Sequence, residues 1–372
     1  MYPRIIETRI ENKLGKGKAI VVTGPRQVGK TTLIKNLLRN TKYLFLDGDD
    51  PTVRNALTNP NTEQLRSLIG QYDTLFIDEA QRIENIGLTM KLITDQFKNV
   101  QLIASGSSAF DISSKLNEPL TGRKWDFTLL PICWEEYENH LGFLQSEQQL
   151  QNRLIYGLYP EVLNHPGEEK DILRELTNSY LYRDVLALAD IRKPEVLEKL
   201  VQALALQVGS EVSYNELAQT VGVDKNTVAS YIDILCDGFV IFKLHSYSKN
   251  IRNEIKSNRK IYFYDNGIRN MIVGNFNSLN LREDTGYLWE NFLIAERLKQ
   301  NLYKNTFSNI YFWRSKQQQE IDLVEEKNGH LTGFEFKWNM NKQVKLPKTF
   351  IEAYKAKGKV INPSNFREFV KI

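Results

Sequence analysis

The sequence AIVVTGPRQVGKTTL, residues 19–33, joins an apolar run to a glycine-containing loop and the beginning of a helical pattern. The run Ala19–Thr23 is typical of a buried parallel β-strand. The loop Gly24–Thr31 fits the pattern GxxxxGK[ST], and the helical run Thr32–Arg39 follows it directly. A strand, this loop and a helix in that order predict a phosphate-binding P-loop, whereas a glycine turn that matched by accident would need no such context.

The predicted loop has the chemistry that a nucleoside triphosphate requires. Gly24 and Gly29 let the backbone curve closely around a phosphate, and the N–H groups at the helix start face the anion. Lys30 can reach the β- and γ-phosphates, and the Thr31 hydroxyl can ligate magnesium. ATP and Mg²⁺ are therefore the predicted cofactors. The residues predicted to contact the nucleotide are Gly24, Pro25, Arg26, Gln27, Val28, Gly29, Lys30, Thr31 and Thr32.

A second predicted strand, Thr74–Asp78, ends in a carboxylate and is followed by another at Glu79. Ligands bind at the carboxyl ends of strands in open α/β sheets. We therefore expect Asp78 to hold Mg²⁺ and Glu79 to orient or polarise the attacking water. A protein that only held nucleotide would have little use for Glu79, so the pair indicates hydrolysis. The alternative is a strand that merely ends in surface acids.

Three further apolar runs extend the predicted sheet: Tyr43–Asp47, Gln101–Ala104 and Trp125–Leu130. Their alternation with helical patterns predicts a parallel α/β sheet. Ser107, in the small-residue segment after the second of these runs, is a candidate for sensing the γ-phosphate, with a plain turn as the alternative. Arg123 is a candidate for neutralising phosphate charge, in cis or from a neighbouring subunit. The predicted catalytic residues are Lys30, Glu79, Ser107 and Arg123.

The segment after residue 195 has the order helix, turn, helix and strand that is typical of a winged-helix unit. Ser213 and Glu216 form a predicted capping box, and Asp224 can cap the second helix. A strand at Phe239–Leu244 follows. Acidic residues in the second helix disfavour contact with DNA phosphates, while the basic residues after it favour such contact. Structural, protein-binding and DNA-binding roles therefore stay open.

Two strand-like runs near the C-terminus carry a second set of acidic residues. Alternation puts Glu320 and Asp322 on one strand face. It puts Glu335 and Lys337 on one face of the next strand, and Asp322 and Glu335 are 13 residues apart (335 − 322). Glu290, on a preceding predicted helix, adds a third carboxylate. Such a set can hold a divalent ion for phosphodiester cleavage, and an amphipathic hairpin with solvated charges is the alternative.

Length and composition favour a soluble protein of several domains. The 372 residues exceed one ordinary core, and a hydrophobic fraction of 41% fits a globular chain. No apolar run approaches the roughly 20 residues that span a bilayer. Charges within Met1–Arg9 disfavour a signal peptide. We therefore expect a cytoplasmic location and no membrane partner, while the net charge of +4 permits contact with nucleic acid without requiring it.

In this order, the motifs resemble those of bacterial and archaeal AAA-like P-loop ATPases that end in a restriction-endonuclease-like domain of unknown function. The resemblance rests on Gly24–Thr31, Phe76–Gln81, Ala104–Ser108, Leu120–Arg123, Gly157–Glu161, Tyr182–Asp184, Tyr264–Gly267, Glu320–Asp322 and Glu335–Lys337. It departs from the nuclease pattern at Ile321, where a proline often precedes the aspartate.

The resemblance implies an α/β fold with an AAA-like parallel sheet of the additional-strand type, a winged-helix unit and a C-terminal nuclease-like α/β domain. The predicted domains are an ATPase domain at 1–145, a helical connector at 146–194, a winged helix at 195–260 and a nuclease-like domain at 261–372.

The leading functional prediction is a Mg²⁺-dependent ATP hydrolase whose nucleotide state rearranges the C-terminal domains. One alternative is a DNA endonuclease licensed by ATP, in which Glu290, Asp322 and Glu335 bind a metal ion beside Lys337. Another is a slow switch that binds a protein partner or a second copy of the chain. ATP is a partner in each case, and DNA, a protein and a homo-oligomer stay open.

Overall fold

The chain packs as two compact units in a computed structural model that describes residues 2–107, 120–179, 193–248, 259–339 and 346–371. The first unit runs from Pro3 to Leu130. The second holds Pro131–Cys236 and the chain from Val240 onward. The predicted division after residues 145, 194 and 260 is finer than these two units and stays a prediction.

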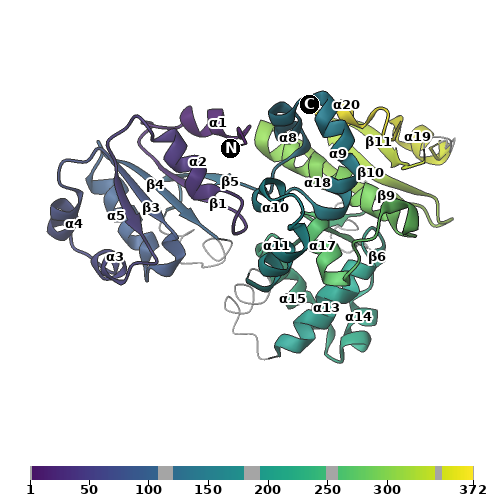
Figure 1. The fold of residues 1–372 in the computed structure, drawn as a ribbon, viewed down its shortest axis with the longest axis horizontal. Coiled ribbons are helices and arrows are strands. Elements are labelled where there is room, and N and C mark those ends of the chain that lie inside the picture. Colours follow the sequence, from purple (N-terminus) through teal and green to yellow (C-terminus); the bar gives the residue numbers. More distant parts are fainter. Residues whose placement is uncertain (1, 108–119, 180–192, 249–258, 340–345, 372) are drawn as a thin grey trace. The chain divides into compact units, whose positions relative to one another are not determined.

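Five parallel strands form the sheet of the first unit, in the order β2-β3-β4-β1-β5 (Figure 1). Their bounds are β1 Ala19–Thr23, β2 Leu44–Asp47, β3 Thr74–Asp78, β4 Gln101–Gly106 and β5 Lys124–Thr128. The five predicted strands are therefore confirmed, with ends that differ by one or two residues where they differ. β4 lies between β1 and β3, which is the strand order of the additional-strand type.

The sheet brings the two predicted halves of the nucleotide site together at the carboxyl ends of its strands. β1 and β3 are buried along their whole length, which explains why both are continuous apolar runs. Ala104 pairs with Val21 on one side and with Ile77 on the other. Because the strands are parallel, the segments that follow Thr23 and Asp78 leave the sheet at the same end, with the end of β4 between them.

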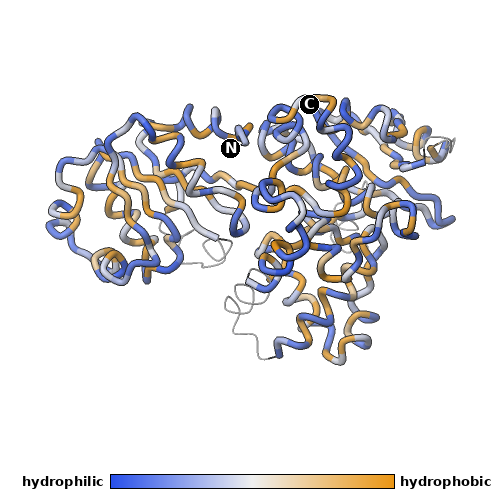
Figure 2. Tube along the Cα trace, viewed as in Figure 1, coloured by the Kyte–Doolittle hydropathy of each residue, from blue (hydrophilic) through white to orange (hydrophobic). Residues whose placement is uncertain are grey.

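Helices complete the first unit: α1 Glu7–Glu11, α2 Lys30–Leu37, α3 Pro51–Leu57, α4 Thr62–Ile69, the short η1 Ala80–Arg82, and α5 Ile86–Gln96. An apolar cluster joins Val21 and Ile77 of the strands to Leu57, Leu65 and Met90 of α3, α4 and α5. Figure 2 shows this distribution of hydrophobic residues: they lie along the strands, and hydrophilic residues lie on the outer turns of the helices.

The second unit begins with helices and a small sheet. The elements are α8 Trp134–Leu141, α9 Phe143–Tyr156, α10 Pro160–Asn164, α11 Glu169–Leu176, α13 Pro194–Leu206, β6 Glu211–Val212, α14 Tyr214–Val221, α15 Lys225–Asp237, β7 Ile241–His245 and β8 Arg259–Phe263. β8 lies between β6 and β7 and is antiparallel to both. Ser213 accepts a hydrogen bond from the Glu216 N–H, which is one half of the predicted capping box, and Asp224 accepts one from the Thr227 N–H, as predicted.

The C-terminal part of the chain contains a four-stranded sheet with the strand order β12-β11-β10-β9. The elements of this part are α17 Asn266–Val273, η3 Leu279–Leu281, α18 Thr285–Lys304, β9 Ser308–Arg314, β10 Glu320–Lys327, β11 His330–Phe336, α19 Lys348–Tyr354, β12 Lys357–Ile361 and α20 Phe366–Val370. β10 and β11 form a hairpin whose turn residues Asn328 and Gly329 have φ of 52° and 76°. Two successive positive φ values are typical of a two-residue type I′ turn.

Helix α18 lies at the centre of this unit. Leu288, Trp289 and Leu293 are fully buried and belong to the large apolar cluster. Although α18 has 20 residues, it also carries Glu290 and Glu296. Of the helices in the described ranges, none combines the length and apolarity that crossing a membrane requires.

Two of the segments that support the family resemblance contact each other in this unit. Asp265 accepts hydrogen bonds from the Leu158 N–H at 2.7 Å and from the Gly267 N–H at 2.8 Å. A Cβ atom at Gly157, where φ is +74°, would lie 1.9 Å from Oδ1 of Asp265. The absence of a side chain at Gly157 and Gly267 therefore allows the end of α9 to pack closely against the start of α17. Another of those segments, Tyr182–Asp184, lies outside the described residues.

Candidate nucleotide-binding site

The loop between β1 and α2 has a backbone that its glycines permit. Gly24 has a φ of +145°, and a Cβ atom there would lie 1.9 Å from the carbonyl oxygen of Leu129. Gly29 has a φ of +91° and directly precedes α2. Because residues with a Cβ rarely adopt these values, both positions favour glycine. The loop therefore turns from the strand into the helix as the sequence predicts.

Lys30 is the first residue of α2 and is only 6% exposed. Its Nζ donates hydrogen bonds to the carbonyl oxygens of Gly24 at 2.9 Å and Pro25 at 2.8 Å. The ammonium group thus lies inside the curve of the loop, where it can meet an anion held by the loop amides.

A buried arginine from the N-terminal segment holds the loop in place. Arg4 donates from Nη1 to the Val28 carbonyl oxygen at 2.8 Å and from Nη2 to the Leu130 carbonyl oxygen at 2.6 Å. It thereby links the P-loop to the segment after β5. Sequence reasoning missed Arg4, and no local signal marks it, because its partners lie 24 and 126 residues away.

The carboxylate of Asp78 receives hydrogen bonds from two hydroxyl groups. Thr31 Oγ1 donates to Asp78 Oδ2 at 2.8 Å, and Ser105 Oγ donates to Asp78 Oδ1. Asp78 is buried at the end of β3, and Ser105 is fully buried in β4. The two predicted metal ligands of the nucleotide site are thus brought together. Ser105 is an additional member of the site, and its contact with Asp78 was not predicted from the sequence.

The donor set at this point fits the predicted magnesium ion. Carboxylate and hydroxyl oxygens are ligand types that Mg²⁺ accepts, together with phosphate oxygens and water. Thr31 and Asp78 would hold the ion, and Ser105 would keep the Asp78 carboxylate in its orientation.

Glu79 follows Asp78 in a constrained backbone position. Its φ of 46° is left-handed, and the Gln81 amide donates a hydrogen bond to its carboxylate. The Gly48 N–H donates to the Asp78 carbonyl oxygen at 2.9 Å, and a Cβ atom at Gly48 would lie 2.4 Å from the Glu79 carbonyl oxygen. The close approach of Gly48 therefore fixes the backbone that carries both carboxylates.

The two remaining predicted catalytic residues lie at opposite ends of the parallel strands. Ser107 directly follows β4, at the same end as the P-loop, and is buried. Arg123 directly precedes β5, its carbonyl oxygen accepts from the Ala19 N–H, and its Nε lies 2.8 Å from Asp95 Oδ1. The four residue steps of β1 that separate these ends span about 13 Å. The structure therefore does not bring Arg123 to the P-loop of its own domain, so a role in cis has no geometric support, and a role in trans stays a prediction.

The C-terminal carboxylates form a separate buried cluster in the second unit. The hairpin pairs Leu323 with Phe334, which puts Asp322 and Glu335 on neighbouring strands. Burial raises the pKa of Asp322 well above its ordinary value, and the charges of Glu290 and Glu335 add to this rise. The Lys337 ammonium donates to Glu335 at 2.7 Å. All four residues of the predicted second site are thus close to one another.

Their arrangement is not that of a metal centre. Within the described ranges, no group of three or more His, Cys, Asp or Glu side chains is placed as ligands of one metal ion. Glu290 instead accepts a hydrogen bond from the Tyr262 hydroxyl at 2.6 Å and pairs with Lys260 at 3.2 Å. The described geometry therefore gives no support to metal binding by Glu290, Asp322 and Glu335, because protein donors already engage their oxygens, and that binding stays a prediction.

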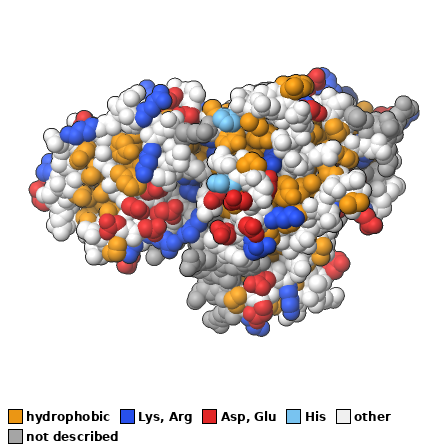
Figure 3. Space-filling view, in the orientation of Figure 1, with side chains coloured by type: hydrophobic (Ala, Val, Ile, Leu, Met, Phe, Trp, Pro, Cys, Tyr) orange, Lys and Arg blue, Asp and Glu red, His pale blue; other side chains and the backbone are white. Residues whose placement is uncertain are grey.

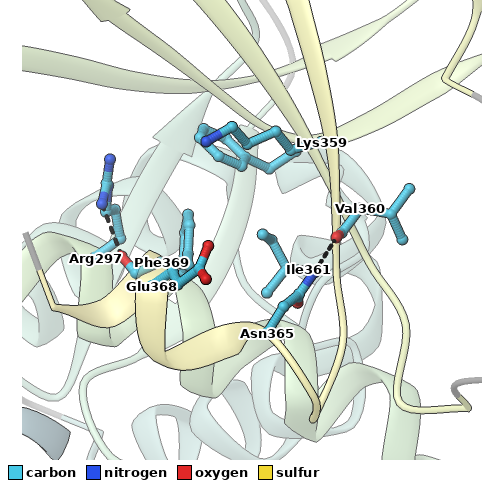
Figure 4. Close-up of a pocket in the computed structure, with 8 residues that line it drawn as sticks. Arg297, Lys359, Val360, Ile361, Asn365, Glu368 and Phe369 are labelled. Carbon is cyan, nitrogen blue, oxygen red and sulfur yellow. Dashed lines mark hydrogen bonds between the residues drawn. The ribbon is translucent and has the colours of Figure 1, made fainter.

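A hollow of about 280 Å³ lies beside β11, β12 and α20 (Figure 4). Arg297 lines it, but its guanidinium donates to the Phe369 carbonyl oxygen and to Glu325. The Asn365 amide donates to the Val360 carbonyl oxygen. The hollow contains no residue of either predicted site.

Residues 16–138 match a family model described as an AAA domain. The P-loop, the parallel sheet and the inserted strand agree with this match, so the first unit is similar to AAA-type P-loop ATPase domains. This similarity supports ATP binding. Residues 147–279 and 285–371 match two further models, each described as a domain of unknown function.

The similarity to known proteins extends over both units. An uncharacterized protein of Mycobacterium tuberculosis is 28% identical over 334 residues, which cover 88% of this chain and 72% of that protein. An uncharacterized protein of Methanocaldococcus jannaschii is 23% identical over 375 residues, with 95% and 82% covered. Among solved structures, a Walker-type ATPase of Pyrococcus abyssi aligns with a TM-score of 0.49 at 14% identity, covering 73% of this chain and 96% of that one.

Proposed function

We propose that this protein binds ATP with Mg²⁺ at the P-loop and hydrolyses it. The observation that carries the proposal is the hydrogen bond between Thr31 and Asp78, because it joins the phosphate-binding loop to an acidic strand end. Loop and carboxylate lie 47 residues apart in sequence. Their contact is what a shared nucleotide and metal site requires.

Each residue of the site has a distinct role in this proposal. The loop amides and Lys30 bind the phosphates, and Thr31 and Asp78 hold the metal. When bound, Mg²⁺ neutralises phosphate charge. Glu79 orients the attacking water and accepts its proton, while Ser107 senses the terminal phosphate.

Direct binding and turnover measurements test the proposal. The wild-type chain should bind a fluorescent ATP analogue and release phosphate only with Mg²⁺ present. Lys30→Ala should weaken binding by about tenfold or more, because a charge-assisted contact to phosphate is lost. Lys35→Ala is the matched control, since Lys35 is an exposed residue of the same helix. No measurable affinity of the wild type for adenine nucleotides would end the proposal.

We further propose that the nucleotide state rearranges the second unit. The order of α13, β6, α14, α15, β7 and β8 supports a winged-helix unit, and the mixed sheet against α18 supports a nuclease-like fold. Hydrogen exchange of peptides from residues 195–260 should then differ between ADP and a non-hydrolysable ATP analogue. Identical exchange with both nucleotides would contradict the coupling.

An ATP-licensed DNA endonuclease is the second candidate, because Asp322, Glu335 and Lys337 converge as the nuclease pattern requires. The absence of a metal-binding arrangement among the described residues weighs against it. On the face seen in Figure 3, acidic and basic side chains are interspersed, which also weighs against a DNA-binding surface there. Plasmid incubated with Mg²⁺ or Mn²⁺, with and without ATP, tests this candidate. Cleavage would support the endonuclease, and intact plasmid under all conditions would contradict it.

A slow switch that binds a protein partner or a second copy of the chain is the third candidate. A pull-down that compares wild type with Glu79→Gln tests it, because a trapped ATP state would retain such a partner.

A further inference from the structure

A buried lysine lies among the C-terminal carboxylates. Lys260, on β8, is 1% exposed. Its Nζ lies 3.2 Å from Glu290 Oε1 on α18 and forms a second ion pair with Glu320 on β10. Burial alone would lower the pKa of Lys260, but the charges of Glu290 and Glu320 raise the pKa above its ordinary value. The ammonium group therefore stays charged inside the protein.

The surrounding carboxylates already have donors. Besides Lys260, the Tyr262 hydroxyl donates to Glu290 Oε1 at 2.6 Å. The Phe336 N–H donates to Asp322 Oδ2 at 2.7 Å, and Lys337 donates to Glu335 Oε1 at 2.7 Å. A divalent ion needs several deprotonated oxygens that converge on one point. Here the ammonium group, with its three N–H donors, supplies positive charge at the cluster instead.

We propose that the Lys260 ammonium group takes the place of a divalent metal ion in this cluster. The cluster is then an internal ion-pair network that joins β8 to α18 and β10. A second cation beside a buried ammonium would be repelled in a medium of low polarity, so the two occupants exclude each other. This inference concerns the second unit alone and does not depend on ATP binding.

Mn²⁺ binding to the full-length, nucleotide-free protein tests the proposal, with free Mn²⁺ followed by electron paramagnetic resonance. Wild type and Asp322→Asn should give the same titration, because the wild-type cluster holds no metal. Lys260→Met should gain one Mn²⁺ per chain, and the double variant Lys260→Met with Asp322→Asn should lose it again. Lys299→Met is the matched control, because Lys299 is equally buried and pairs with Glu296 elsewhere in the unit.

Thermal unfolding gives an independent readout. Lys260→Met removes the ammonium partner of the buried Glu290 carboxylate and of Glu320, so its Tm should fall. Mn²⁺ should raise that Tm while leaving the Tm of the wild type and of Lys299→Met unchanged. Wild-type Mn²⁺ binding that Asp322→Asn removes would overturn the proposal, and this comparison stands even where Lys260→Met does not fold. A folded Lys260→Met that gains no Mn²⁺ would overturn it as well.

Discussion

The Thr31 hydroxyl donates a hydrogen bond of 2.8 Å to Oδ2 of Asp78. The donor is the last residue of the P-loop and lies in the first turn of α2, and the acceptor is the last residue of β3. Ser105 donates to the other carboxylate oxygen from β4, which lies between β1 and β3. The inserted strand thus contributes to the site and also sets the spacing between its two halves.

Glu79→Gln should retain ATP binding and lose turnover. The amide cannot accept a proton from water, so we expect hydrolysis to fall by about 100-fold. Phosphate release and nucleotide titration, measured on one preparation, check this. Glu63→Gln, an exposed change in the same unit, is the control. Hydrolysis at the parental rate in Glu79→Gln would remove Glu79 from the mechanism.

Ser105→Ala should raise the Mg²⁺ concentration that gives half-maximal hydrolysis. Residues that orient a metal ligand typically change metal affinity by roughly tenfold or more when they are removed. Thr94→Ala is the matched control, because it removes a buried hydroxyl that donates to the Met90 carbonyl oxygen within α5. If the Mg²⁺ dependence of Ser105→Ala is the same as that of Thr94→Ala, the hydrogen bond to Asp78 has no role in metal binding.

We expect Arg123 to contribute to catalysis from another copy of the chain. Arg123→Ala and Glu79→Gln should each be inactive alone, and a mixture of the two should recover part of the ATPase activity. The reason is that a site with an intact Glu79 can then receive Arg123 from the other variant. Full activity of Arg123→Ala by itself would show that the residue serves only its ion pair with Asp95.

Gly157→Ala should destabilise the second unit more than Gly142→Ala does. Both glycines have backbone angles that other residues avoid, with φ of 74° and 84°, so each substitution costs roughly 1–3 kcal/mol of strain. At Gly157 the added Cβ would also meet Asp265 at 1.9 Å, whereas at Gly142 nothing lies within 4 Å. Urea unfolding of both variants measures the difference, and equal losses would mean that the Asp265 contact is unimportant.

Asp284 should make stability depend on pH. Burial alone would raise the pKa of this carboxyl, but hydrogen bonds from Arg282 and Arg269 hold the pKa below its ordinary value. Because the folded pKa is the lower one, the stabilisation is present above the ordinary aspartate value of about 3.9 and is lost as pH falls through the folded pKa.

Asp284→Asn tests this dependence. At neutral pH it should lower the free energy of unfolding by about 3 kcal/mol, since it removes the carboxylate that pairs with the two buried arginines. The gap to wild type should shrink as the pH falls from about 4 through the lower folded pKa, below which the wild-type carboxyl is also neutral. Asp171→Asn, which breaks an exposed pair with Arg174, is the control. A gap that stays constant with pH would contradict the assignment.

Local patterns in the sequence were sufficient for much of the first unit. The strands and the loop Gly24–Thr31 could be predicted because strand burial and phosphate binding depend on neighbouring residues. The pairing of Thr31 with Asp78 followed from a general rule on strand ends. The hydrogen bond from Ser105 to Asp78 was not predicted, because which of the nearby hydroxyls faces Asp78 depends on how β3 and β4 pair.

The order of residues in the chain thus specified a P-loop, an acidic strand end and a hairpin with Asp322 and Glu335. Only the folded structure showed that Arg4 hydrogen-bonds the segments around the P-loop and that Arg123 lies at the amino ends of the strands. It also showed that Lys260 pairs with the C-terminal carboxylates. The physical reason is distance along the chain. Backbone curvature and strand formation are governed by adjacent residues, whereas the partner of a buried charge is chosen by packing that brings remote segments together.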